Sequence, residues 1–275
     1  MQTIHVSSAQ QSTKSTVLIM GDQINRGIAS LADKTPDDTR ILFIELATKF
    51  SDKQWHKQKV HLLLSALKHF AQELREEGFE VDYRIAKNLS EGLTAHKKDF
   101  DVSHVIAMEP MNWNGKKILE NLDIELVRNN QFLCHYEDFA EWTSTKKKFK
   151  MEDFYRWQRK RLGILMDGSS PCEGKWNFDH DNRERPPRDG REWPSITLFE
   201  HDDIDSDILQ NLDDFWGAYP KGVWPVTREQ ALIRLDEFVK GALRPFGPYE
   251  DAMLGKEWKL AHSVLSSSLN IGLLH

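Results

Sequence analysis

Polar side chains follow successive apolar runs near the start of the chain. Gly21, Asp22 and Gln23 end the first run, Glu45 stands near the end of the second, and His56 opens the segment after it. Asp and Gln can hydrogen-bond a heterocycle or a ribityl chain, and glycine permits a tight turn and close backbone approach. In an open parallel sheet such groups lie at the carboxyl edge, where ligands of doubly wound folds bind. The pattern predicts a small-molecule pocket.

Each of these groups also has a plainer interpretation. Asp22 and Gln23 could make only local turn hydrogen bonds. Glu45 could be a surface carboxylate, and His56 a water-facing residue at the start of a helix. Both interpretations stay open at this point.

A charged stretch in the middle of the chain combines aromatic and basic side chains. Lys175, Trp176, Phe178 and Arg183 lie in a region rich in Gly and Pro, which suits contact with phosphates and unstacked bases. The aromatic residues could instead pin a long loop to the protein. The preceding helical segment carries Arg156, Arg159 and Arg161, which could neutralise phosphates or simply be solvated.

Near the end of the chain, residues 262–269 read His-Ser-Val-Leu-Ser-Ser-Ser-Leu. We expect them to open a helical segment whose first turn offers hydroxyls and free backbone N–H groups, an arrangement that attracts phosphate. An ordinary serine-rich helix cap is the alternative.

Several classes of chemistry lack the residues that they need. The sequence contains no nucleophile elbow, Walker loop, GxGxxG or HExxH motif. Cys134 and Cys172 are the two cysteines, so neither a disulfide framework nor a four-cysteine cluster is expected from this chain. No metal-ligand spacing is evident, and we expect no metal site.

The bulk composition is that of a folded, water-soluble protein. The 275 residues are 39% hydrophobic and 29% charged, with a net charge of −6. This balance argues against a uniformly basic nucleic-acid surface and leaves a local one open. The apolar runs are too short to cross a membrane and no signal peptide is evident, so we expect a cytoplasmic protein.

The elements that must position these residues form an α/β pattern. Five short apolar runs predict parallel strands, and a helix from about His56 to Glu77 follows the second of them. The runs are Thr16–Met20, Ile41–Ala47, Phe79–Ile85, Val102–Met108 and Ile124–Val127. A basic helix is expected at about Met151–Met166, a long linker at Asp167–Pro194, and an all-helical last third that includes Ile204–Trp216 and Arg228–Ala242.

Taken together, these segments resemble the deoxyribodipyrimidine photolyase-related family of iron–sulfur bacterial cryptochromes and (6-4) photolyases. The resemblance covers nearly the whole chain from Thr16 onward. It depends on these segments: residues 18–23, 56–59, 66–70, Glu109-Pro110 with Trp113, 151–156, 163–166, 174–179, Asn182-Arg183 and 251–253.

The resemblance implies a Rossmann-like five-stranded sheet with flanking helices, a linker, and the first helices of an all-α FAD-binding domain. The implied division is a disordered extension at 1–15, an antenna domain at 16–150, a basic helix and linker at 151–202, and a truncated helical domain at 203–275. A 6,7-dimethyl-8-ribityllumazine antenna would contact Gly21, Asp22, Gln23, Glu45 and His56. Where relatives carry an acidic and an aromatic residue after the second strand, this sequence has Lys49 and Asp52, which bears on lumazine binding.

The same resemblance assigns the FAD phosphates to His262, Ser263, Leu265 and Ser266, with His262 in place of the family's Thr. It places the charged loop beside a DNA lesion, and so adds Asp179 to the DNA-contacting residues Arg156, Arg159, Lys175 and Arg183. Light captured by the antenna would reach reduced FAD, which donates an electron to a flipped pyrimidine lesion.

The sequence stops before the helices that would surround the flavin and before the four cysteines that hold a 4Fe-4S cluster in relatives. We therefore expect either part of a light-driven DNA lyase or a non-repairing module that binds a chromophore or nucleotide, such as a cryptochrome-like light sensor. Without the missing flavin domain, apolar residues such as Val264, Leu265, Leu269 and Ile271 should be exposed.

Overall fold

The structure is a computed structural model that describes residues 14–51, 53–102, 104–110 and 112–275. Most of the extension predicted at 1–15 lies outside the described residues. The chain divides into two compact units. The sheet unit contains residues up to 129 together with 198–230 and 267–275, and the loop unit contains 130–197 and 231–266. The domain boundaries implied by the family resemblance remain predictions.

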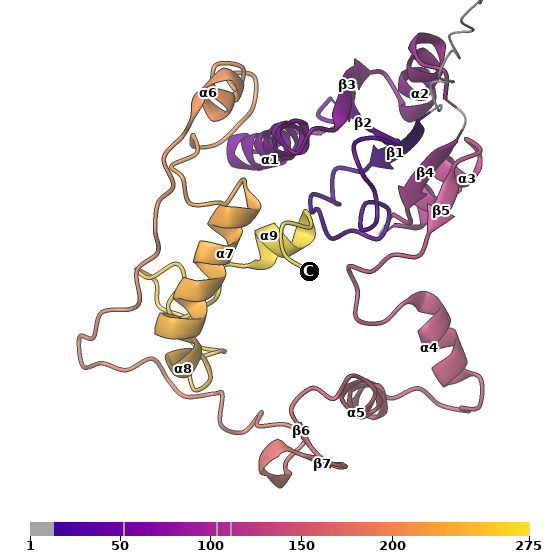
Figure 1. The fold of residues 1–275 in the computed structure, drawn as a ribbon. Helices are drawn as coiled ribbons and strands as arrows, with labels where there is room; N and C mark the ends of the chain where they lie inside the picture. The colour runs from indigo at the N-terminus through magenta and orange to yellow at the C-terminus, as the bar shows by residue number, and fades with distance from the viewer. Residues whose placement is uncertain (1–13, 52, 103, 111) are drawn as a thin grey trace, which may run out of the picture. The chain divides into compact units, whose positions relative to one another are not determined.

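A five-stranded parallel sheet forms the centre of the sheet unit (Figure 1). Its order is β3-β2-β1-β4-β5, so the chain reverses direction across the sheet between β1 and β4. The strands are β1 Ser15–Ile19, β2 Thr39–Leu46, β3 Glu80–Ala86, β4 Val105–Met108 and β5 Glu125–Val127. This confirms the predicted Rossmann-like α/β fold with flanking helices.

Helices cover both faces of this sheet because its strands are apolar on both sides. Helix α1 (Lys57–Glu76) lies on one face, where Phe70 packs edge-on against Phe43 of β2. Helices α2 (Leu89–Asp99) and α3 (Trp113–Glu120) supply Leu93 and Leu119 to a second core that includes Leu18 and Leu42. The alternation along β2 therefore sends neighbouring residues to opposite layers.

A distant segment of the chain packs on α1 within the same unit. Helix α6 (Asp203–Leu209) and the residues after it place Ile208 and Leu212 against Trp55 and Val60. The backbone N–H of Lys57 donates to the carbonyl of Trp216 at 2.9 Å. The start of α1 is thus fixed by a residue 159 positions later in the sequence.

The loop unit contains two aromatic-rich helices and an irregular segment. Helices α4 (Tyr136–Thr143) and α5 (Met151–Leu162) share a ring cluster that contains Trp142, Phe154 and Trp157. Gly163, at φ 67°, ends α5 in the left-handed conformation that glycine adopts without strain. The basic helix therefore stops four residues earlier than predicted.

The predicted linker does lack long regular elements. A two-residue hairpin, β6 (Met166–Asp167) with β7 (Ser170–Pro171), precedes a 3₁₀ turn at Cys172–Gly174. The residues from 175 to 202 then form no helix or strand.

Among the described residues, the regular elements of the last third are all helices, as predicted, but the bounds of the first of these helices were predicted wrongly. Helix α6 ends at Leu209 instead of Trp216, and α7 (Arg228–Glu237) continues as a π-helical turn at Phe238–Ala242 and a short α8 (Leu243–Phe246). Glycine and proline account for the interruptions, because they are frequent in both 217–225 and 245–255. Helix α9 covers only Ser266–Asn270.

The expected exposure of the apolar residues in this region is confirmed for only one of them. Leu269 is exposed, whereas Leu265 and Ile271 are buried and Val264 is half-buried. None of the helices in the described ranges is long and apolar enough to span a bilayer.

Candidate functional site

The carboxyl edge of the sheet, where β1 and β4 separate, holds a buried polar network around Gln23. The Gln23 side chain is fully buried, and its amide nitrogen donates to the carbonyls of Met108 at 3.1 Å and Glu109 at 3.2 Å. Its amide oxygen accepts from the N–H of Met20 at 3.4 Å. Gln23 therefore joins the carboxyl ends of the adjacent strands β1 and β4 at the switch point.

Sequence reasoning missed the second half of this network. Nζ of Lys116 lies 3.0 Å from Oε1 of Glu109, and Asn129 donates through its side chain to the Glu109 carbonyl at 2.7 Å. Glu109 and Asn129 are both buried. Glu109 follows β4 as Gln23 follows β1, so the rule that polar residues after parallel strands share an edge could have found it.

Asp22 is the polar residue next to this buried network, and it is half-buried. Burial raises the pKa of its carboxyl above the usual value, while its own backbone N–H and the positive charge of Lys49 act in the opposite direction. The residue that departs from the family pattern, Lys49, is thus electrostatically coupled to the predicted ligand-binding Asp22. A donor from a ligand would offset the cost of burying this carboxylate.

Glu45 and His56 each have a protein partner. The hydroxyl of Tyr83 donates to Oε2 of Glu45 at 2.6 Å, and burial together with this carboxylate raises the pKa of Tyr83. His56 caps α1 through Nδ1, which accepts from the N–H of Gln58 at 3.2 Å, and its ring packs edge-on against Trp216. Both residues are held in fixed orientations by contacts within the sheet unit.

The strand register places part of the predicted antenna set at one level. Ile19 pairs with Phe43, so Gly21 and Glu45 each lie two residues beyond a paired position. A Cβ added at Gly21 would meet only Leu67 at an ordinary 3.8 Å, so packing alone does not require glycine there.

A buried triad in the sheet unit has the geometry of a nucleophile relay but not its accessibility. Oγ1 of Thr16 lies 2.9 Å from Nε2 of His96, and Nδ1 of His96 lies 2.6 Å from Oδ2 of Asp82. Thr16 and His96 are completely buried. Because no substrate reaches such a hydroxyl, the triad fixes α2 to the sheet and is not a hydrolytic site.

In the loop unit, the two predicted DNA-contacting arginines Arg156 and Arg159 differ in their exposure to solvent. The guanidinium of Arg159 is buried and donates to the carbonyls of Ile164 at 3.2 Å and Trp176 at 3.0 Å, and also to that of Leu165. Arg156 is exposed and pairs with Glu152 at 2.7 Å. Arg159 therefore holds the loop in place, while Arg156 remains accessible to a phosphate.

Trp176 is the point at which the basic helix and the charged loop meet. Arg156, Arg159 and Lys160 all lie within 5.5 Å of the centre of its ring. The neighbouring Lys175 is exposed, with Nζ 5.5 Å from the Phe178 ring. Two of the five predicted DNA-contacting residues, Arg156 and Arg159, are thus brought together around one indole, and Lys175 contacts the ring of Phe178 instead.

The other two predicted DNA-contacting residues are exposed on the loop after Trp176. Arg183 forms a weakly aligned ion pair with Asp251, at 3.6 Å, and most of both side chains is exposed. Asp179 lies between Trp176 and Arg183 in sequence and is exposed. An exposed pair of this kind is easily exchanged for a phosphate.

Three of the four predicted phosphate-binding residues, His262, Ser263 and Leu265, precede α9 instead of forming its first turn. His262 places its ring nitrogens 2.8 Å and 3.0 Å from the carbonyls of Lys259 and Glu250, and Oγ of Ser263 accepts from the N–H of Leu265 at 3.4 Å. Ser266 opens α9. The sequence prediction of a continuous helical segment from His262 is therefore wrong, because Val264 has φ 57° and interrupts it.

Two serines that the sequence analysis did not select are the better sign of a missing polar ligand. The hydroxyls of Ser267 and Ser268 are buried and have no hydrogen-bond partner among the described residues. Buried hydroxyls of this kind are costly unless something polar meets them.

The fold and its polar carboxyl edge define the class to which the protein belongs: a doubly wound α/β protein with a ligand edge at the switch point. The family model for deoxyribodipyrimidine photo-lyase-related proteins matches residues 17–219. The chain is also 33% identical to a (6-4) photolyase of Agrobacterium fabrum over 94% of its own length. The chain therefore belongs to the deoxyribodipyrimidine photo-lyase-related family, which confirms the resemblance found in the sequence.

Two further comparisons concern an uncharacterized protein and a solved structure that is similar in fold. An uncharacterized protein of Acanthamoeba polyphaga mimivirus is 27% identical over 55% of this chain and 86% of its own length. A crystal structure of a bacterial class III photolyase from Agrobacterium tumefaciens superposes with a TM-score of 0.57 at 14% identity, covering 98% of this chain and 53% of that one. The chain spans 54% of the length of the (6-4) photolyase that it matches.

Proposed function

We propose that this chain is the light-harvesting and DNA-docking part of a light-dependent DNA repair flavoprotein related to (6-4) photolyases, and that it acts in the cytoplasm. The observation that carries the proposal is the switch-point edge: a half-buried Asp22 of raised pKa next to the buried Gln23 network. A carboxylate held this way binds a donor-rich heterocycle more readily than water-exposed acids do, because its desolvation has already occurred.

In this proposal the residues of the sheet unit bind and orient an antenna chromophore, 6,7-dimethyl-8-ribityllumazine. Asp22 accepts hydrogen bonds from it, Gln23 keeps the two strand ends at a fixed separation, and Glu45 and His56 border the site in orientations set by Tyr83 and Trp216. Lys49 adds a positive charge beside Asp22. This charge favours an anionic or strongly polarised ring over a neutral one.

The loop unit supplies the proposed contact with damaged DNA. Arg156, Lys175 and Arg183 are exposed cations that would neutralise phosphates, and Asp179 lies among them on the lesion side. Arg159 acts as a positioning residue, because its bonds to three loop carbonyls hold the segment that carries the others. Phosphate contacts of this type set affinity and register without reading sequence.

For FAD, the residues present fit a partial phosphate site. The unpartnered hydroxyls of Ser267 and Ser268 suit phosphate oxygens, and we place His262, Ser263, Leu265 and Ser266 beside them in sequence as the remaining contacts. FAD, when bound and reduced, would supply the electron for repair. A 4Fe-4S cluster does not fit this chain, because Cys134 and Cys172 provide only two of the four thiolates needed.

A second candidate function is a chromophore-binding light sensor that does not repair DNA. The internal use of Arg159 favours this alternative, since it removes one of the five predicted DNA-contacting groups from the surface. Both candidates share the antenna and differ in DNA binding.

The test is to purify the chain and determine any bound chromophore by absorption spectrum and mass, and then to measure binding to duplex DNA with and without a (6-4) lesion. A ribityllumazine together with lesion-selective binding supports repair. A ribityllumazine without selective DNA binding supports the sensor. Protein that contains no chromophore and gains none when lumazine is added contradicts both.

A further inference from the structure

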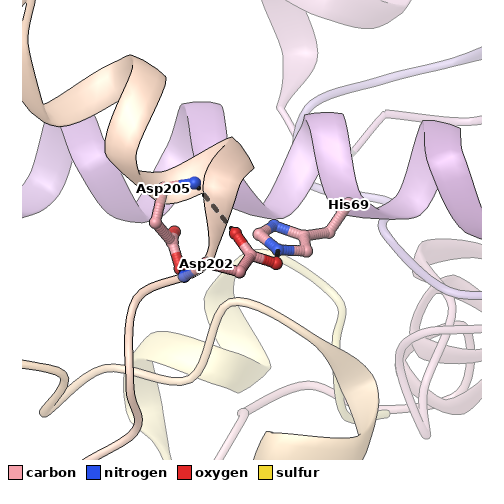
Figure 2. A group of neighbouring side chains, drawn as sticks. All are labelled: His69, Asp202 and Asp205. Atoms are coloured by element: carbon pink, nitrogen blue, oxygen red, sulfur yellow. Dashed lines mark hydrogen bonds and ion pairs between the residues drawn. The ribbon is translucent and has the colours of Figure 1, made fainter.

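We propose that a divalent transition metal ion binds to the sheet unit between α1 and α6, with His69, Asp202 and Asp205 as ligands. The donor atoms of these three side chains all lie within 4.8 Å of one another. Figure 2 shows the imidazole of His69, from α1, directed at the carboxylate of Asp202, which precedes α6. The sequence suggested no metal site because His69 is more than 130 residues away from the two aspartates.

The hydrogen bonds of His69 leave one ring nitrogen directed at a carboxylate. Nδ1 lies 2.7 Å from the carbonyl oxygen of Ser65, which can only accept, so Nδ1 carries a hydrogen. In the neutral ring, Nε2 then presents a lone pair to Oδ2 of Asp202 at 2.8 Å. Two acceptors face each other, and a positive ion must lie between them: either a proton or a metal. Donation from one ring nitrogen to a backbone carbonyl is the usual second-shell arrangement of a metal-binding histidine.

A second histidine on the same face of α1 lies against one of these carboxylates. His61 is 4% exposed, and its Nε2 has no hydrogen-bond partner among the described residues. This nitrogen lies 3.1 Å from Oδ1 of Asp205 without the alignment of a hydrogen bond. His61 therefore reaches one of the carboxylates that the proposed ion would share with His69.

Local structure holds the carboxylates ready for this role. Asp202 and Asp205 form a reciprocal capping box at the start of α6, and Oγ of Ser65 lies 2.6 Å from Oδ1 of the buried Asp205. His61, Ser65 and His69 recur at intervals of four along α1, so they lie on one face of that helix. The exposed Asp202 side chain can turn by the few tenths of an ångström that an ion would require.

The mixture of donors selects the kind of ion. Imidazole nitrogen with carboxylate oxygen suits Zn²⁺ and its neighbours, whereas Mg²⁺ and Ca²⁺ prefer oxygen ligands alone. Bound there, the ion would join the segment around α6 to α1 in addition to their apolar packing. This inference does not depend on the proposed light-harvesting function, because none of the proposed chromophore contacts takes part in it.

The experiment uses the full chain after treatment with a chelator. ZnCl₂ is titrated calorimetrically, and thermal unfolding is followed with and without the metal. We expect one ion per chain and a higher Tm with zinc, because a ligand that binds only the folded state stabilises it. The variants His69→Gln and Asp202→Asn should each weaken binding by at least about tenfold. Asparagine still caps a helix, so the second variant is expected to fold.

His104→Gln is the matched control. His104 pairs with Glu125 at 2.6 Å on the surface of the same unit, so it also places an imidazole beside a carboxylate. Its zinc affinity should equal that of the wild type. The inference is overturned if no saturable zinc binding occurs. It is equally overturned if His69→Gln and Asp202→Asn bind zinc as well as the control, since the pair would then be only a protonated histidine with its counter-ion.

Discussion

The sheet unit and the loop unit carry their polar groups in opposite ways. In the sheet unit, Gln23 and His96 are fully buried and bonded to backbone or side-chain partners across the sheet. In the loop unit, Arg156 and Arg183 are exposed and pair with nearby acids. Removing a buried, hydrogen-bonded polar group lowers folding stability strongly. Exposed ion pairs contribute little to folding stability and exchange partners readily.

This difference matches two kinds of recognition. A small, rigid chromophore requires a pocket that is formed before it binds, whereas a DNA backbone is met by mobile cations that gain counterion release. Arg159 differs from the other predicted DNA-contacting arginines because it is buried. Its hydrogen bonds go to the loop backbone, as expected of a buried polar group with a structural role.

The largest expected effect comes from His96→Ala. The change leaves the buried Thr16 hydroxyl and the Asp82 carboxylate without their common partner. The free energy of unfolding should fall by about 3 kcal/mol, as measured by urea unfolding. The surface variant His104→Ala should change it by less than about 0.5 kcal/mol. An equal loss of unfolding free energy in His96→Ala and His104→Ala would contradict the stabilising role given to the buried His96.

The second largest loss of stability is expected from Gln23→Ala. It removes the bonds to the carbonyls of Met108 and Glu109, with an expected loss of about 2 kcal/mol. Chromophore affinity should fall with it, because the two strand ends are no longer joined. Gln72→Ala, which removes an exposed bond to Glu76, is the control and should be neutral. A Gln23→Ala protein with unchanged stability and chromophore affinity would contradict the proposed role of Gln23 in joining the ends of β1 and β4.

Within the loop unit, the two arginines should behave differently. Arg159→Ala should destabilise the unit by about 2 kcal/mol, because three carbonyls lose a buried donor. Arg156→Ala should leave stability unchanged but weaken DNA binding and reduce the salt dependence by about one phosphate contact. Binding isotherms at several salt concentrations distinguish the two. Reversed behaviour would contradict the roles assigned here.

The smallest effect is a dependence of stability on pH. Burial lowers the pKa of His96 below its ordinary value of 6.5 and outweighs the hydrogen bond and charge of Asp82, which act to raise it. The unfolded chain then takes up a proton that the folded chain resists, so this contribution is complete above pH 6.5 and is lost as the pH falls toward the lower folded pKa. The difference between the unfolding curves of wild type and His96→Ala should shrink from pH 7 to pH 5. A constant difference would refute the assignment.

The strands could be predicted from the sequence because their periodicity is local. The five runs lie within three residues of the observed starts and ends, since β-branched clusters bounded by turns leave few alternatives. In the last third, the helix predicted at Ile204–Trp216 ends early at Leu209, and glycine and proline in 217–225 and 245–255 interrupt the helical pattern. Thr227 caps α7 by accepting from the N–H of Gln230, and the Gln230 side chain accepts from the N–H of Val226.

The candidate sites show the limits of a local pattern more clearly. Asp22 and Gln23 could be selected because strand ends share an edge, but their different degrees of burial could not be foreseen. Arg156 and Arg159 look equivalent on a helix until the loop that covers one of them is known. The neighbours His69, Asp202 and Asp205 depend on tertiary packing alone.

The most direct test of the central claim is a titration of 6,7-dimethyl-8-ribityllumazine into the wild-type chain and into Asp22→Asn, with the thermal stability of both recorded. Because burial raises the pKa of Asp22, the neutral amide should leave Tm unchanged or slightly higher. We expect saturable lumazine binding by the wild type and its loss in Asp22→Asn at undiminished stability. Equal binding by both proteins, or no binding by either, would contradict this expectation.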